Sequence, residues 1–236
     1  MPFVCAGKGG RMMHKSLQSL LKWLIPFVLM PSLVVLSSFV FRQKFHLFIS
    51  FAAAALAVLL FLTGFERKNV GTRRLVIVSV MTALCIAGRF IPFFKPVTAI
   101  TVIAAVYLGR ESGFLVGAMA ALLSNFYFGQ GPWTAFQMLS WGLIGWFAGA
   151  LAQPLQKSRA FLLLYGVLSG IFYSLLMDVW TVLSLNGSFT FPHYLAAVAT
   201  SMPHMVLYAA ANFLFLWFLA KPFGDKLGRI RIKYGL

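Results

Sequence analysis

Residues 45–65 of the chain read FHLFISFAAAALAVLLFLTGF, a run of 21 residues that contains no Asp, Glu, Lys or Arg. A helix needs about 20 mostly apolar residues to cross a bilayer, because each residue adds about 1.5 Å to its length. Seven further apolar stretches follow this pattern, although one of them is short. They cover residues 20–41, 75–91, 97–108 (the short stretch), 113–128, 134–152, 161–185 and 194–220. The sequence therefore predicts eight membrane-spanning helices.

The composition excludes most other classes of protein. Of the 236 residues, 61% are apolar and 10% are charged, whereas a soluble domain carries about 25% charged residues. Two cysteines cannot form a disulfide framework. Long unbroken apolar runs also differ from the alternating strands of an outer-membrane barrel. We therefore predict an all-α polytopic membrane protein, because helices satisfy their own backbone hydrogen bonds in lipid.

The distribution of charge predicts the orientation. The chain has 20 Lys and Arg residues against 4 Asp and Glu, and the basic residues fall in the gaps between apolar runs. This placement favours the positive-inside rule over nucleic-acid binding. With a cytoplasmic N-terminus, 16 of the 20 basic residues lie on the cytoplasmic side. Eight spans with both termini in the cytoplasm therefore fit best.

A change in composition near residues 66–74 divides the chain. The first two spans are plain, whereas the other six carry most of the Gly, Trp, Asn and Gln. We predict a cytoplasmic leader, a two-helix N-terminal appendage, a basic cytoplasmic linker, a six-helix core and a basic cytoplasmic tail. These units cover residues 1–19, 20–65, 66–74, 75–220 and 221–236.

Polar and aromatic side chains gather at the predicted outer ends of the core helices. The three outer connections are 89–97 (RFIPFFKPV), 124–133 (SNFYFGQGPW) and 186–194 (NGSFTFPHY). Such clusters suit a concave site for a small organic ligand, and an interfacial aromatic belt is the alternative. The candidate ligand-binding residues are Arg89, Lys95, Asn125, Gln130, Trp133, Gln137, Trp141 and Asp178.

Asp178 is the only acidic residue inside a predicted span. Three roles remain open for it: an ion pair with Arg89, a ligand contact, or a structural hydrogen bond. We read His204, beside Pro203, as a polar residue packed at a helix kink. The sequence has no cluster with metal-ligand spacing and no nucleotide-binding motif. It therefore predicts no metal, no cofactor and no ATPase activity in this chain.

Small residues recur four positions apart, on one face of a helix, where they let a second backbone approach closely. Three of the pairs are glycines: Gly113 with Gly117, Gly145 with Gly149, and Gly166 with Gly170. Internal packing is the favoured interpretation of these three. Ala83 and Ala87 form a fourth pair, which is the best candidate for docking a partner helix.

The core resembles the S-component, the substrate-binding membrane subunit of energy-coupling factor (ECF) transporters. The resemblance covers residues 73–236 and rests on three stretches: FIPFFKPVT at 90–98, residues 113–117, and above all NFYFGQGPWTAFQMLSWGLIGWFAG at 125–149. This last stretch is similar to a subgroup with an extra N-terminal helical pair, linked to uptake of cobalamin or precursors such as α-ribazole. The minimal family core has six helices, which leaves the role of residues 20–65 open.

The resemblance implies a multi-pass protein of a prokaryotic cell membrane that binds a vitamin-like compound from outside. It further implies docking on a scaffold membrane subunit that carries two ABC-type ATPases, with Ala83 and Ala87 at the place of the family's docking face. A stand-alone channel or secondary carrier is the main alternative. A membrane enzyme is a weaker one, since the outer half of the core offers only Asp178, His193 and His204 for chemistry.

Overall fold

The computed structural model describes residues 17–39, 46–64 and 71–234, and every regular element within these ranges is a helix. The N-terminal helix is already formed at Leu17 and contains a π-helical turn, η1 (Ile25–Leu29). Pro26 lies in this turn and cannot donate a backbone hydrogen bond, which explains the local irregularity. The predicted residues 1–16 of the leader, most of the linker and the connection between the first two spans lie outside the described residues.

The two N-terminal helices continue as α2 (Met30–Phe39) and α3 (His46–Thr63). The remaining helices are α4 (Gly71–Gly88), α5 (Val97–Leu108), α6 (Arg110–Phe128), α7 (Trp133–Ala150), α8 (Ala152–Lys157), α9 (Arg159–Asn186) and α10 (Phe191–Tyr234). The described part of each predicted apolar run therefore lies mainly on a helix, although residues 89–91 fall in the α4–α5 connection, and the short run at residues 97–108 is the short helix α5. The brief helix α8 was not predicted.

Four helical segments are long and apolar enough to cross a membrane: Leu17–Leu36, His46–Thr63, Arg159–Leu185 and Phe191–Tyr234. This confirms an all-helical membrane protein. The count of eight spans and the cytoplasmic position of both termini remain predictions.

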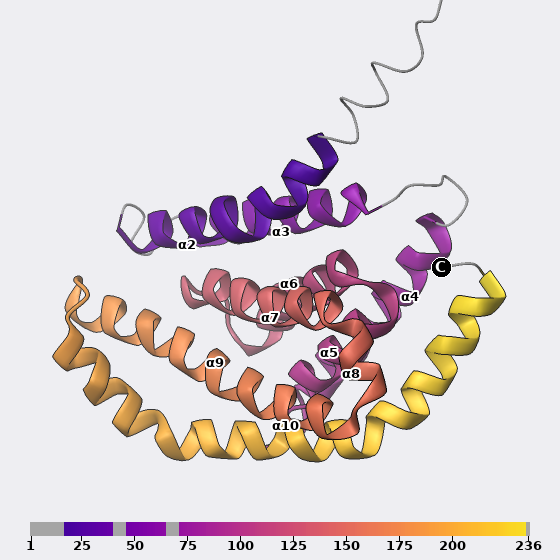
Figure 1. Cartoon of the computed structure of the whole chain (residues 1–236). Helices are drawn as coiled ribbons and strands as arrows, with labels where there is room; N and C mark the ends of the chain where they lie inside the picture. The colour runs from indigo at the N-terminus through magenta and orange to yellow at the C-terminus, as the bar shows by residue number, and fades with distance from the viewer. Residues whose placement is uncertain (1–16, 40–45, 65–70, 235–236) are drawn as a thin grey trace, which may run out of the picture.

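The last helix, α10, is 44 residues long, about twice the length that a bilayer requires. It includes Pro203 and Pro222 and appears as one long arc (Figure 1). The predicted boundary between core and tail at residue 220 therefore falls inside a helix.

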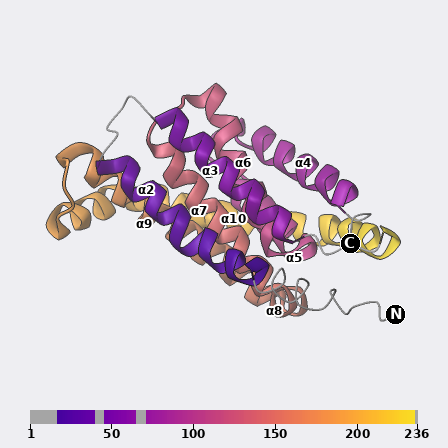
Figure 2. The same cartoon turned by 90° about the horizontal axis from the view of Figure 1, so that it is seen from above.

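The helices lie in layers around α6 and α7, which pack closely along their length (Figure 1). The pair α2 and α3 covers one side of this central pair, and the hairpin of α9 and α10 covers the other. Seen from above, α2 and α3 run side by side over the bundle while α4 lies at its edge, next to α6 (Figure 2).

The three glycine pairs are sites of internal packing, as favoured above. A β-carbon on Gly113 would lie 2.7 Å from the carbonyl oxygen of Gly145, so α6 and α7 can approach only without side chains there. A β-carbon on Gly170 of α9 would lie 2.8 Å from the Cα of Ala209 on α10. These close contacts hold together the two helix pairs that frame the cavity described below.

The N-terminal pair is fastened to the core by aromatic and charged contacts. The rings of Trp23 and Phe27 each lie 4.9 Å, between centroids, from the buried indole of Trp146. Lys22 lies 3.6 Å from the carboxylate of Glu111 at the start of α6. The described N-terminal helices therefore pack against α6 and α7 of the core.

Candidate functional site

A cavity of about 700 Å³ opens between the α4–α5 connection, α6, α7, α9 and α10. We name it the Arg89 cavity. Its volume lies within the range of sites for drug-sized ligands. Five of the eight candidate residues line it: Arg89, Lys95, Gln137, Trp141 and Asp178. The structure thus brings together residues from helices that are far apart in the sequence.

Arg89 is held in place by a chain of buried polar side chains. Its Nη1 donates to the Ser124 hydroxyl and, at 2.7 Å, to the Asn125 side-chain oxygen. The Asn125 amide nitrogen donates in turn to Gln137 Oε1 at 2.7 Å and to the Thr134 hydroxyl at 2.9 Å. Asn125 therefore stands behind the cavity wall and fixes the orientation of Arg89.

Aromatic rings form the wall beside this chain. Trp141 stacks on Tyr173, with ring centroids 5.0 Å apart and planes 12° apart, and its indole nitrogen donates to the Tyr208 hydroxyl at 2.9 Å. The Arg89 guanidinium lies 4.8 Å from the Phe128 ring centroid and 5.4 Å from that of Trp141. A wall of fixed aromatic faces suits a flat aromatic ligand.

The cavity lining also includes Asp178 from α9 and Ser201 from α10. The Ser201 hydroxyl donates to Asp178 Oδ2 at 2.6 Å. Among the described residues no ion pair joins Asp178 to Arg89, so of the roles left open above, the pairing with Arg89 is absent. Asp178 makes a structural hydrogen bond and still faces the cavity.

The α4–α5 connection forms the rim of the cavity. It includes Phe93, which is largely exposed and has a backbone φ of 62°, a conformation that costs a bulky residue about 1–3 kcal/mol. Lys95 lies in the same connection, with its ammonium 5.8 Å from the Phe128 ring centroid. Partial burial and the neighbouring charge of Arg89 lower the pKa of Lys95. Two cations therefore share this rim.

The structure places the remaining candidates elsewhere. Gln130 bonds to the Leu122 carbonyl at 2.8 Å and to Thr134 at 3.0 Å, and thereby ties the α6–α7 connection together. Trp133 packs over Gly131 and does not line the cavity. The predicted third connection, residues 186–194, contributes none of the described lining residues either.

Sequence reasoning missed several residues of the cavity wall. Tyr173, Ser174, Ser201 and Tyr208 line it, but they lie on α9 and α10 within ordinary apolar runs. Ser174 and Asp178 lie four residues apart, on one helix face, which was an available signal. Among the described residues, no group of three His, Cys, Asp or Glu side chains could hold a metal ion.

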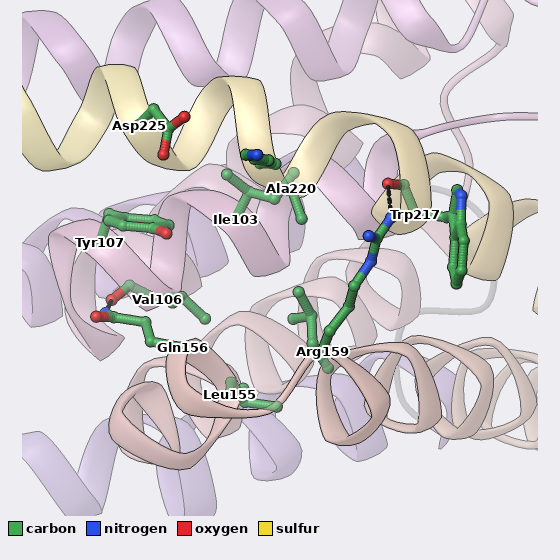
Figure 3. A pocket seen from close by; sticks show the side chains of 11 residues that line it. Ile103, Val106, Tyr107, Leu155, Gln156, Arg159, Trp217, Ala220 and Asp225 are labelled. Atoms are coloured by element: carbon green, nitrogen blue, oxygen red, sulfur yellow. Dashed lines mark hydrogen bonds between the residues drawn. The ribbon is translucent and has the colours of Figure 1, made fainter.

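A second, smaller pocket of about 260 Å³ lies between α5, α8, α9 and α10 (Figure 3). We name it the Arg159 pocket. The Arg159 guanidinium lies 3.9 Å from the Trp217 ring centroid and donates to the Trp217 carbonyl at 2.9 Å. The Gln156 amide donates to the Val106 carbonyl at 2.8 Å. These contacts join neighbouring helices.

The Ala83 and Ala87 pair lies on the exposed face of α4. Ala83 also lines an apolar groove of about 260 Å³, whose other walls include Val58 of α3 and Leu115 of α6. Unlike the glycine pairs, this small-residue face is therefore not covered by the described part of the chain.

The fold and the Arg89 cavity define a helical, multi-pass membrane protein with a ligand-sized site at one end of its core. The model of the family described as ECF-type riboflavin transporter, S component, matches residues 69–221, about two thirds of the chain. The chain belongs to this family and is a substrate-binding subunit of an ECF transporter. The family match gives no support to the cobalamin-linked subgroup.

Membership in this family implies association with an ECF scaffold and its ATPases, and a vitamin-like ligand. The family is one of transporter components and not of enzymes. Neither the comparison with curated proteins nor that with solved structures gave a match.

Proposed function

We propose that the chain captures a flat heteroaromatic vitamin or vitamin precursor in the Arg89 cavity, from the outer side of a prokaryotic cell membrane. The stacked pair of Trp141 and Tyr173 supports this proposal most directly, because it presents a fixed aromatic face in the cavity wall. The Arg89 network beside it supplies polar groups that can orient such a ring. ATP hydrolysis by the partner ATPases then drives release into the cell.

Riboflavin and α-ribazole are the two leading candidates. Both have a flat ring system and a hydroxylated chain or ribose, and both belong to the size class that a cavity of about 700 Å³ accommodates. The family description favours a riboflavin-type ligand. Intact cobalamin is much larger than a drug-sized ligand and is the weakest member of the cobalamin-related group for this cavity.

Binding by the full-length, detergent-purified protein tests this proposal. Native mass spectrometry against riboflavin, α-ribazole, cobinamide and cobalamin should give a retained adduct with one of the first two. An adduct with cobalamin alone would exclude the flat-ligand proposal. Uptake of ligand by liposomes that contain this chain without scaffold or ATPases would favour the channel or carrier alternative.

We further propose that the exposed face around Ala83 and Ala87 docks on the scaffold. Its small side chains permit close helix packing, and Val58 of α3 borders the same groove, so the N-terminal pair would flank the docked subunit. Ala83→Trp should abolish co-purification with the scaffold and leave ligand affinity within about twofold. Ala199→Trp, at an exposed alanine of α10, is the matched control and should leave both properties unchanged.

A loss of ligand binding in Ala83→Trp would instead indicate that this face supports the internal packing of the core. Normal co-purification of that variant would place the docking surface elsewhere.

A further inference from the structure

Arg89 is a buried cation whose donors are only partly used. Its side chain is 8% exposed, and Nη1 donates to Ser124 and Asn125. Its Nε is buried and has no hydrogen-bond partner. A buried donor without a partner costs about 1–3 kcal/mol, and a buried charge costs more. Since Arg89 lines the cavity, a ligand can bind its guanidinium there and offset part of this cost.

Ser174 gives an independent observation of the same kind. Its side chain is 4% exposed, its hydroxyl has no hydrogen-bond partner, and it lines the same cavity. The cavity wall therefore contains two buried polar groups, one in the α4–α5 connection and one on α9, that the protein leaves unsatisfied. Unsatisfied groups of this type are rare in folded proteins and call for a partner.

The charges of the cavity do not balance. Among its described lining residues, Arg89 and Lys95 are cationic and Asp178 is the one carboxylate. Asp178 accepts from Ser201 and forms no ion pair with either cation. Arg89 is also fixed by its bonds to Asn125 and by the faces of Phe128 and Trp141. Its free donor is therefore oriented before a ligand arrives, which reduces the entropic cost of binding.

From these observations we propose that the ligand carries an anionic group, a carboxylate or a phosphate monoester, which accepts hydrogen bonds from the Arg89 guanidinium and pairs with Lys95. This proposal rests on the proposed function, because it assigns the Arg89 cavity as the ligand site. Among the flat compounds proposed above, it gives forms that bear such an anion, for example a phosphate ester of riboflavin, a higher affinity than the neutral compounds. Charge-assisted hydrogen bonds of this kind are about twice as strong as neutral ones.

Two matched pairs of compounds isolate the anion. Riboflavin and its 5′-phosphate differ by a phosphate, and nicotinamide and nicotinate differ by a carboxylate. Calorimetry on the full-length wild-type protein should show that the anionic member of at least one pair binds at least tenfold more tightly than its neutral partner. The pair that shows this preference identifies the anion. Inorganic phosphate alone should compete weakly, because it lacks the ring.

Lys95→Gln is the main test variant, because Lys95 lies in a connection and the substitution leaves the buried network intact. It should reduce the ratio of the two affinities, that of the anionic member over that of the neutral member, about fivefold or more. Arg89→Gln should remove the preference altogether. Ser174→Ala is the control, because the loss of an uncharged donor should weaken both members of a pair equally.

Equal or tighter binding of the neutral members, or an unchanged preference in Lys95→Gln, would overturn this inference and leave the proposed function standing. Tight binding of another, neutral vitamin in the wider panel would do the same. Absence of binding by every compound in both panels would overturn the proposed function, and this inference with it.

Discussion

The Arg89 cavity and the Arg159 pocket use the same kinds of side chain for different purposes. Each is lined by an arginine, a lysine, a tryptophan, a glutamine, a tyrosine and an aspartate. In the Arg159 pocket, the arginine and Gln156 both donate to backbone carbonyls of neighbouring helices. In the Arg89 cavity, the arginine and Gln137 bond to other side chains, and Arg89 Nε has no partner.

This difference shows that the same residue type can join neighbouring helices in one place and remain available to bind a ligand in another. A donor that ends on a backbone carbonyl of the next helix is satisfied in the folded chain and stabilises it. A buried donor that is held in place but left without an acceptor needs a partner from outside the chain. The matched residues of the two sites allow the comparison to be tested one pair at a time.

Replacement of the two tryptophans should give the largest difference in ligand affinity between the two sites. Trp141→Ala removes the stack on Tyr173 and the bond to Tyr208, so ligand affinity should fall by about 2–3 kcal/mol, or roughly 30- to 150-fold in Kd. Trp217→Ala should leave Kd within about twofold. Calorimetric titration of both variants measures the contrast, and equal losses would end the distinction between the two sites.

Replacement of the two glutamines should give a smaller difference in ligand affinity between the two sites. Gln137→Ala removes a bond that orients Asn125 and, through it, Arg89. The binding free energy should therefore weaken by about 1–2 kcal/mol, which raises Kd roughly 5- to 30-fold. Gln156→Ala loses only its bond to the Val106 carbonyl. The same titration should show no change in Kd for Gln156→Ala. If both glutamine variants bound normally, the Arg89 network would not control the cavity.

The pH dependence of binding should separate the two lysines. The pKa of Lys95 lies below its usual value of 10.5, because of burial and the nearby charge of Arg89. A bound anion favours the charged lysine, so affinity is full below this lowered pKa and falls, up to about tenfold, as pH rises through it. The fall in affinity is therefore centred on a pH below 10.5, in the window around the lowered pKa of Lys95.

Lys95→Arg should abolish this fall in affinity, because arginine stays charged throughout the window. Lys221→Arg, in the Arg159 pocket, should leave the pH profile of the wild type unchanged. A profile that does not respond to Lys95→Arg would assign the titration to another group.

The smallest effect is expected at Arg159. Arg159→Met removes the contact with Trp217 and the bond to its carbonyl, and should lower the free energy of unfolding by about 0.5–1.5 kcal/mol. Ligand affinity should not change. Denaturant unfolding with and without ligand measures both quantities, and reduced ligand affinity would show that the pockets are coupled.

Much of the fold follows from the apolar pattern. The described part of each predicted run lies mainly on a helix, and even the short helix α5 was predicted with the bounds Val97–Leu108. The pattern could not predict α8, which is six residues long, nor that α10 continues past residue 220. Hydropathy reports the length of an apolar run, whereas the end of a helix depends on its neighbours.

The candidate site was predicted in part. Arg89, Lys95, Gln137, Trp141 and Asp178 all line one cavity, because polar side chains at helix ends are costly in lipid and turn toward protein or a cavity. The same argument could not separate them from Gln130 and Trp133. Those two residues are used within the α6–α7 connection itself, by a bond to Leu122 and by packing over Gly131.

The sequence alone determined that this chain is a helical membrane protein whose polar and aromatic residues gather at helix ends, because the cost of placing polar groups in lipid acts on every residue separately. Only the tertiary structure decided that Arg89 meets Asn125 and not Asp178, and that Ser174 faces the cavity without a partner. Such pairings depend on which helix faces meet. Close packing of Gly113 against Gly145 and of Gly170 against Ala209 sets that arrangement, and helix periodicity does not.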